Sequence, residues 1–510
     1  MASHVTTRKL PDESILAIAE YSFDKHSPDY ETLYNACLVS RQFARSFVPK
    51  LWHTIDLARL SQFKRKGRIE TLMRLLAGKS LSDECRYLIK RIDMPEGLKI
   101  DTDVLTILGN SLDWIKGYYA EGFKVYLRSQ ICKRPDAEDS ILALMMVLAP
   151  GLEELSWERR ASYTVVASLF AFARYPNVYS RQYRGDETPV IANLKTFELR
   201  NAVMKTSVTR RPAKIQPFFV GHDLESIAVD NICCVGALDS VREIYPAPRY
   251  WFKRRLLSVE FTMSTLGAIL FESLLRYSPH LRKLVLEDHF FRPAAAPDSP
   301  VITLGRMGDT LRTYGQSLTH LELHHRDIHP FHDARHEFGH LGSLKSLTNL
   351  RYIAINQTLL SEEDGLGLGS ISVSHSISGL LPTSLEELLI VTPTTSTRSE
   401  GLEMLKLLQR NAEFQTLSRV AITAPGDDAD PYTPKKATSW KTGGWQYARY
   451  DKQNQQYKLC RVGHELDEWV CSVIHPSTWG SLPRIPGGPE QKGRKRERTG
   501  FLRSLFRRGN

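Results

Sequence analysis

A six-residue pattern, apolar-x-x-apolar-x-apolar, recurs along most of the chain and restricts the folds that the chain can adopt. A short strand with this pattern has one apolar face, which a single unit cannot bury. Stacked units bury such faces in one continuous core. From the third copy onward the mean interval is about 32 residues. The ten copies begin at Ile89, Leu152, Leu194, Leu224, Leu256, Leu281, Leu318, Leu350, Leu385 and Leu417.

Helical segments precede several copies of the pattern. Apolar residues at helical spacing lie in Ile141–Leu148, Thr265–Leu275 and Leu402–Leu408,. A proline or polar break then leads into the strand, so each unit predicts a helix, a turn and a short strand. We therefore expect an α/β repeat fold, with short parallel strands on an inner curve and helices outside.

The array resembles leucine-rich repeats, which implies a solenoid. It departs from that family because its interval exceeds the usual 20–29 residues. The family's Asn or Cys position is also mostly missing. Polar insertions interrupt the array at residues 180–189, 291–300 and 361–370. An α/β domain built from repeated βα units would leave the same alternation of strands and helices, and it stays the alternative.

Residues between the apolar strand positions are expected on the inner face, because side chains alternate along a strand. Their charges are mixed, which favours a protein partner over a phosphate backbone, since the latter requires Lys and Arg. The predicted inner-face residues are Lys195, Glu198, Glu225, Glu260, Lys283, His320, Glu322 and Glu386. The predicted substrate contacts among them are Glu198, Glu225, Glu260, Lys283 and Glu322.

The first 55 residues have helical signals of a different kind. Pro11 suits the first turn of a helix, and Asp12 and Glu13 follow at the positive end of its dipole,. A second helix is predicted from Leu33, and Pro49 is predicted to end it, because the residue before a proline is pushed out of helical geometry. The residues Leu51, Trp52 and Ile55 follow as a last apolar anchor.

The stretch L-P-D-E-S-I-L-A-I, followed by A-C-L-V-S-R-Q-F and L-W-H-T-I, resembles the F-box in the form common in fungal F-box proteins. The resemblance covers residues 10–55. It implies a three-helix motif that docks on a Skp-type adaptor, which tethers the chain to a cullin–RING ubiquitin ligase. The alternative is a helical cap on the repeat array. The implied adaptor contacts are Leu10, Pro11, Ile15, Leu16, Leu38, Val39, Ser40, Phe43, Leu51 and Trp52.

Charge and cysteine content exclude several classes of function. The formal net charge is +11, but residues 491–510 alone hold eight Lys or Arg and one Glu. The rest of the chain is close to neutral, so it does not predict a specific nucleic-acid interface. The seven cysteines show no C-x-x-C spacing, which is typical of a reduced compartment without a zinc knuckle,. No cofactor is expected.

Hydropathy predicts a soluble intracellular protein. The longest apolar run, Ile141–Ala149, is too short for a transmembrane helix, which needs about 20 residues,. The N-terminal residues form no apolar signal segment,. We therefore expect a cytoplasmic or nuclear location, or both.

The motif H-E-x-x-H occurs once, at His336-Glu337-Phe338-Gly339-His340, and is the signature of zinc metalloproteases,. On a helix the two histidines would share one face and bind zinc, with Glu337 as general base. The extended motif fails, however, because Ser346 stands where a third ligand belongs, and Gly339 weakens a helix. A polar loop is the favoured interpretation, and a zinc hydrolase the remote alternative.

The C-terminal part divides into two segments. Aromatic residues are dense between Trp440 and Trp469, which predicts a folded cap on the last repeat,. From Pro476 the composition predicts disorder, and a solvated tail is the favoured interpretation. Within it, Arg494-Lys495-Arg496 resembles a nuclear-import cluster,. The residues from Phe501 to Arg508 could instead form a basic amphipathic turn on an anionic membrane,. The expected organisation is F-box 8–57, helical linker 58–83, solenoid 84–423, aromatic cap 424–475 and basic tail 476–510.

These expectations together predict a non-catalytic substrate receptor of an SCF-type cullin–RING ubiquitin ligase. The F-box would hold the adaptor, and the inner face of the solenoid would hold a protein substrate. Such a protein supplies proximity rather than bond chemistry. A leucine-rich-repeat scaffold without a ligase role remains the main alternative.

Overall fold

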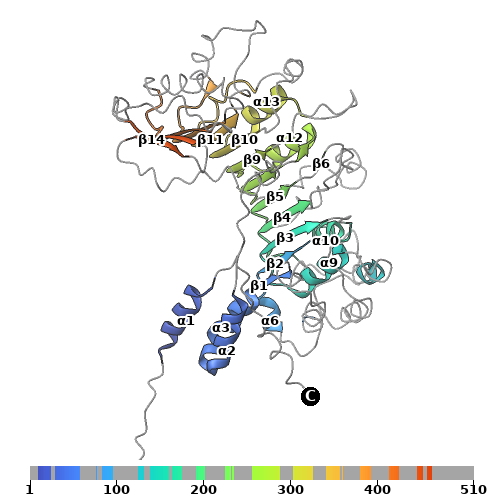
Figure 1. Cartoon of the computed structure of the whole chain (residues 1–510). Helices are drawn as coiled ribbons and strands as arrows, with labels where there is room; N and C mark the ends of the chain where they lie inside the picture. The colour runs from blue at the N-terminus through green and yellow to red at the C-terminus, as the bar shows by residue number, and fades with distance from the viewer. Residues whose placement is uncertain are drawn as a thin grey trace, which may run out of the picture. The chain divides into compact units, whose positions relative to one another are not determined.

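The fold is described from a computed structural model of the chain (Figure 1). It describes residues 10–23, 29–57, 76, 83–95, 125–130, 138–159, 164–174, 191–201, 224–230, 233–234, 255–262, 264–287, 302–324, 341–356, 359, 380–391, 413–423, 445–451 and 456–461. The predicted helix Leu402–Leu408, the three predicted insertions, the H-E-x-x-H motif and the basic tail lie outside these residues.

A 13-stranded sheet forms the centre of the fold, and its first eleven strands are parallel and adjacent in chain order. This confirms the predicted α/β class with a parallel sheet. The parallel strands are β1 (Thr54–Asp56), β2 (Arg91–Met94), β3 (Glu154–Arg159), β4 (Thr196–Asn201), β5 (Ser226–Asp230), β7 (Ser258–Thr262), β9 (Lys283–Glu287), β10 (His320–His324), β11 (Tyr352–Asn356), β12 (Glu387–Val391) and β13 (Arg419–Thr423).

All ten copies of the apolar pattern lie in this sheet in matching register. The second apolar residue of each copy pairs with its counterpart on the next strand, as Leu155 does with Phe197 and Leu284 with Leu321. The first residue of each copy precedes its strand and is also buried. The aligned rows form one core cluster, as expected when units with one apolar face stack.

The strand β1 is an eleventh copy, and it lies in the segment predicted to belong to the N-terminal motif. Its pattern is Trp52-x-x-Ile55-x-Leu57. Ile55 and Leu57 are buried in the core of the sheet, and Trp52 packs against it. The sheet therefore begins at Thr54, within the segment predicted as F-box and before the array start predicted at residue 84.

Helices α9 (Glu138–Leu148), α10 (Thr164–Arg174), α12 (Ala268–Tyr277) and α13 (Leu304–Tyr314) lie between strands, and α6 (Asp83–Tyr87) precedes β2. Apolar side chains of α9, α10, α12 and α13 share the core cluster with the inward-facing strand residues. These four helices therefore cover the apolar face of the sheet (Figure 1). The predicted helix at Thr265 starts at Ala268 instead, because Thr265 and Leu266 form β8, which pairs with β6 (Cys233–Cys234).

Helices α1 (Asp12–Tyr21), α2 (Tyr30–Val39) and α3 (Arg41–His53) form the helical module, the N-terminal part of the fold. Its own small core consists of Ile15, Ala19, Leu33 and Phe47. The last helix leads without a break into β1.

The prediction of one helix from Leu33 that ends at Pro49 was wrong. Ser40 divides the segment, because its extended backbone (φ −164°, ψ 166°) stops α2, while its hydroxyl accepts a 3.2 Å hydrogen bond from the N–H of Phe43. A serine in this position stabilises the start of a helix. Helix α3 then continues through Pro49, which lacks a backbone donor, and the packed side chains of Phe47 and Leu51 hold the helix on both sides of it,.

Two antiparallel strands extend the sheet past β13. Strand β15 (Gln456–Arg461) pairs with β13, and β14 (Trp445–Asp451) pairs with β15. This hairpin lies in the segment predicted to cap the last repeat. Within the described part of the chain, no helix is long and apolar enough to cross a membrane.

Candidate functional site

The helical module exposes large apolar side chains. Leu10 and Leu16 are 49% and 48% exposed, and Leu38 and Val39 are both 66% exposed. The Nε2 atom of Gln42, at the start of α3, donates a 2.9 Å hydrogen bond to the carbonyl of Leu10. Because Leu38 and Val39 end α2 just before Gln42, this bond brings Leu10 to the same end of the module. We name Leu10, Leu16, Leu38 and Val39 the apolar patch.

The ten predicted adaptor contacts divide into two groups. Leu10, Pro11, Leu16, Leu38, Val39 and Ser40 are exposed. The other four pack inside the protein. Ile15 is in the module's core, and Phe43 and Leu51 are half-buried against it. Trp52 packs against the core of the sheet. The structure thus leaves six of the ten accessible to a partner.

Ile18 and Tyr21, which are not among the predicted adaptor contacts, are also exposed apolar residues, at 43% and 97%. Ile15 and Ala19 face the core one helical turn apart. On a helix, Leu16 and Ile18 then fall on opposite sides of that buried stripe. The helical spacing in the sequence is therefore enough to predict that Leu16 and Ile18 lie on the two flanks of the buried stripe.

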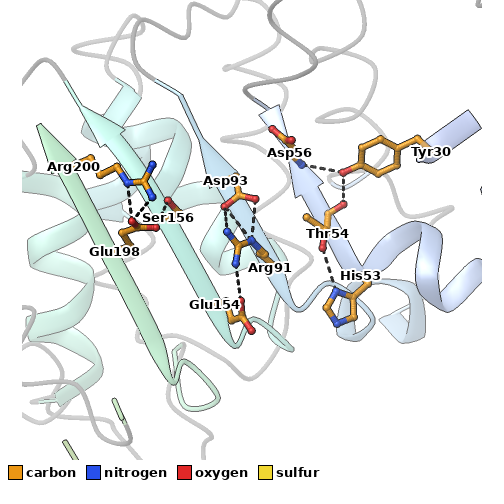
Figure 2. Close-up of polar contacts among 10 residues, drawn as sticks. All are labelled: Tyr30, His53, Thr54, Asp56, Arg91, Asp93, Glu154, Ser156, Glu198 and Arg200. Carbon is orange, nitrogen blue, oxygen red and sulfur yellow. Dashed lines mark hydrogen bonds and ion pairs between the residues drawn. The ribbon is translucent and has the colours of Figure 1, made fainter. Parts of the chain in front are cut away.

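Tyr30 joins the helical module to the sheet (Figure 2). Its hydroxyl donates a 2.8 Å hydrogen bond to the carbonyl of Thr54 and accepts a 3.1 Å bond from the N–H of Asp56. On the opposite side, β1 pairs with β2, where the carbonyl of His53 accepts from the N–H of Lys90. The phenol thus occupies the outer edge of the first strand.

The polar face of the sheet, opposite the helices, is rich in carboxylates from β1 to β10. Figure 2 shows part of this face, from β1 to β4. Strand register places three Lys or Arg side chains there, Arg91, Arg200 and Lys283. The carboxylates on the same face are Asp56, Asp93, Glu154, Glu158, Glu198, Asp230, Glu260, Glu287 and Glu322. This face therefore carries a net negative charge.

Ion pairs across neighbouring strands partly neutralise these carboxylates. Arg91 contacts Asp93 at 2.9 Å on its own strand and Glu154 at 2.8 Å on β3. Lys283 contacts Glu260 at 2.6 Å. Figure 2 shows Glu198 between Arg200 and the hydroxyl of Ser156, which donates a 2.9 Å bond.

Two carboxyl groups of this face have raised pKa values. Burial raises the pKa of Asp93, and the charges of Asp56 and Glu198 add to this effect against the bonds from Arg91. Burial likewise raises the pKa of Asp230, although Thr262 donates a 2.9 Å hydrogen bond to it. A raised carboxyl pKa means that the folded environment disfavours the negative charge.

The predicted substrate contacts lie in two places. Glu198, Glu260, Lys283 and Glu322 are strand residues of the polar face. Glu225 does not belong to a strand, since it immediately precedes β5.

Lys195 and Glu386, which were also predicted on the inner face, precede β4 and β12 in the same way. Lys195 forms a 2.9 Å ion pair with Glu153, which Lys90 also contacts at 3.0 Å. The prediction assumed that side chains alternate between the two faces from the first apolar residue of each copy. That residue lies in the turn before the strand, so the alternation does not hold for the residue that follows it.

The polar face changes character toward β11 and β12. Val285, Ala354 and Leu389 occupy positions of this face, yet they are buried and lie outside the main core cluster. This part of the face is therefore covered, whereas the carboxylate-rich part from β2 to β7 is half-exposed. At the border, His320 stacks on Tyr352 with ring centroids 4.0 Å apart and contacts the buried Glu322.

Among the described residues, no group of three or more His, Cys, Asp or Glu side chains is arranged to hold a metal ion. No model of a protein family matches the chain, and the search for similar curated proteins found no match.

Proposed function

We propose that this protein is a substrate receptor of an SCF-type cullin–RING ubiquitin ligase. In this proposal the helical module is an F-box that binds a Skp-type adaptor. The parallel array is a leucine-rich-repeat-like solenoid that binds a protein substrate on its polar face. The protein itself catalyses no bond formation; it raises the local concentration of the substrate beside the ligase.

The observation that carries the proposal is the exposure of the apolar patch. Leu38 and Val39 are two-thirds exposed in a module whose own core contains only four fully buried side chains. These residues come from the L-V-S-R part of the F-box resemblance. Several exposed large apolar side chains on one small module suggest a site for a protein partner, and helices with such side chains commonly dock in apolar grooves.

The chain order of the sheet supports the solenoid part of the proposal. Eleven parallel strands lie side by side in chain order, and helices α9, α10, α12 and α13 pack on one face. The opposite face offers carboxylates and paired cations rather than a basic surface. Such a face suits a protein better than a nucleic acid, whose phosphates require Lys and Arg.

Adaptor binding by the full-length chain tests the proposal. We expect a Kd on the order of micromolar or tighter for a purified Skp-type adaptor in isothermal titration calorimetry. The Leu38→Ser/Val39→Ser variant should weaken binding by about 30-fold or more, because buried apolar anchors dominate such interfaces.

The matched control is Ile18→Ser/Tyr21→Ser. It removes two exposed apolar side chains from the same module, outside the predicted contact set, and should leave the affinity unchanged. Absence of binding by a folded wild-type chain would reject the ligase role and leave a repeat scaffold, which the sheet alone supports. Equal losses in both variants would reject the assignment of the patch.

A further inference from the structure

Tyr30 is held in place by its own helix. The carboxylate of Asp29 caps the start of α2, accepting from the N–H of Glu31 at 3.1 Å and of Thr32 at 3.2 Å. The hydroxyl of Thr32 donates a further 2.8 Å bond to Asp29. Tyr30 is the first residue of this capped helix, so its backbone is fixed before its side chain reaches the sheet.

The position of the Tyr30 hydroxyl requires both a donor and an acceptor. The carbonyl of Thr54 accepts from it, and the N–H of Asp56 donates to it. A phenol can do both at once. Thr54 and Asp56 are buried, and buried backbone groups depend strongly on their hydrogen bonds.

The other two helices also reach the junction with β1. The ring of Phe23, just after α1, packs edge-on against His53 at 5.0 Å between centroids. Helix α3 enters β1 directly, and its Trp52 packs against the sheet core. Contacts from α1 and α3 converge on the end of one helix, whereas Tyr30 provides a separate attachment from α2 to the strand edge.

We propose that Tyr30 is a positioning residue that fixes the helical module on the first strand of the sheet. This role deepens the proposed function and rests on it: an adaptor on the apolar patch and a substrate on the polar face would then keep one mutual geometry. Two attachments at separate points prevent the bending that one covalent junction permits. A fixed geometry confines the substrate to a smaller volume beside the ligase and so raises its effective concentration.

Tyr30→Phe in the full-length chain tests this role, because it removes the hydroxyl and keeps the ring. We expect amide hydrogen exchange in β1 to accelerate by about 10-fold or more, because the substitution removes both hydrogen bonds of the Tyr30 hydroxyl,. Tyr34→Phe is the matched control. It removes a hydroxyl one turn further along α2 and should leave exchange in β1 unchanged.

A distance measurement separates positioning from simple stabilisation. Spin labels at two exposed residues, Asn35 on α2 and His280 before β9, report the separation of module and sheet by double electron–electron resonance. Labels introduced through a keto-bearing amino acid leave the native cysteines untouched. We expect one narrow distribution in the wild type and Tyr34→Phe, and a broad one in Tyr30→Phe. An unchanged width in Tyr30→Phe, even with a lowered melting temperature, would overturn the proposal.

Adaptor affinity distinguishes this inference from the proposed function. Tyr30 lies outside the apolar patch, so Tyr30→Phe should bind a Skp-type adaptor as tightly as the wild type. Failure of the wild type to bind would reject the adaptor role, while the distance distributions would still test Tyr30. A narrow distribution in Tyr30→Phe together with normal adaptor binding would reject Tyr30 alone.

Discussion

The helical module and the sheet differ in how completely they bury their apolar residues. The sheet joins strand and helix side chains in one large core. The module has four fully buried apolar residues. It also holds six of the nine large apolar side chains that are exposed among the described residues.

This difference separates two roles. A large core buries its apolar residues within the fold, and single exposed apolar residues on its surface do not indicate a binding site. A small module whose exposed apolar residues gather on two short helices leaves surface for another protein to cover. The sheet therefore buries its apolar face within the fold, whereas the module leaves large apolar side chains exposed.

Phe197→Ala in β4 should produce the largest loss of stability. Phe197 is fully buried and packs against Phe170 of α10, with 5.4 Å between ring centroids. Truncation of such a side chain costs about 3–5 kcal/mol. The neighbouring strands β3 and β5 would also lose packing, because Leu155 and Ile227 lie in register with Phe197. Urea unfolding followed by circular dichroism measures the loss. A midpoint equal to that of the wild type would contradict one continuous core.

Phe47→Ala should act on the module and leave the sheet largely unchanged. Phe47 is 2% exposed, and its ring stacks on Phe43 at 5.8 Å. We expect a local loss of about 2–4 kcal/mol, because the small core has few other contacts. Hydrogen exchange should accelerate in α1, α2 and α3 and stay unchanged from β3 to β10. Faster exchange throughout the sheet would show that the two regions form one cooperative unit.

The sequence predicted the sheet well, because each unit repeats the same local constraint. Ten copies of one pattern fix which residues face the core, and all ten lie in register. The eleventh copy, at Trp52, was missed because its residues also match the F-box ending. Trp52 lies in the last turn of α3 and also begins a strand pattern, and only the pairing of β1 with β2 reveals the second role.

The site was harder to predict, because exposure depends on packing between elements. Ile15 and Leu16 are adjacent in one motif, yet the structure buries the first and exposes the second. Tyr30 carried no signal at all. Its role depends on a hydroxyl that reaches a strand 24 residues later, and no local pattern encodes such a contact.

Ser40→Ala tests why residues 30–53 form two helices, α2 and α3, where the sequence predicted one. The Ser40 hydroxyl caps α3 by accepting from the N–H of Phe43. Loss of such a cap costs about 1 kcal/mol, and alanine also favours one continuous helix through residue 40. Melting temperature and amide exchange at residues 41–44 measure the effect, with the exposed Ser14→Ala in α1 as control. Equal effects of the two substitutions would contradict a capping role.

Asp230→Asn tests the charge of the polar face and should have the smallest effect. Burial raises the pKa of Asp230, so its charge opposes folding at neutral pH, and this penalty fades as the pH falls through the folded pKa. Asparagine keeps an oxygen acceptor for Thr262. The variant should therefore be more stable than the wild type at neutral pH, by less than about 1 kcal/mol, and the gain should shrink in acid.

Glu153→Gln, the matched comparison, should show the opposite sign. Burial acts to raise the pKa of Glu153, but bonds from Lys195 and Lys90 outweigh it and leave that pKa lowered. Its charge therefore stabilises the fold above the ordinary glutamate pKa, and this contribution is lost as the pH falls. The variant should be less stable than the wild type at neutral pH and converge with it in acid. Urea unfolding of both variants from pH 7 down to about pH 3, below the ordinary glutamate pKa, measures the two trends. If both substitutions changed stability in the same direction at neutral pH, burial of Asp230 and ion pairing of Glu153 would not explain the stability of the two variants.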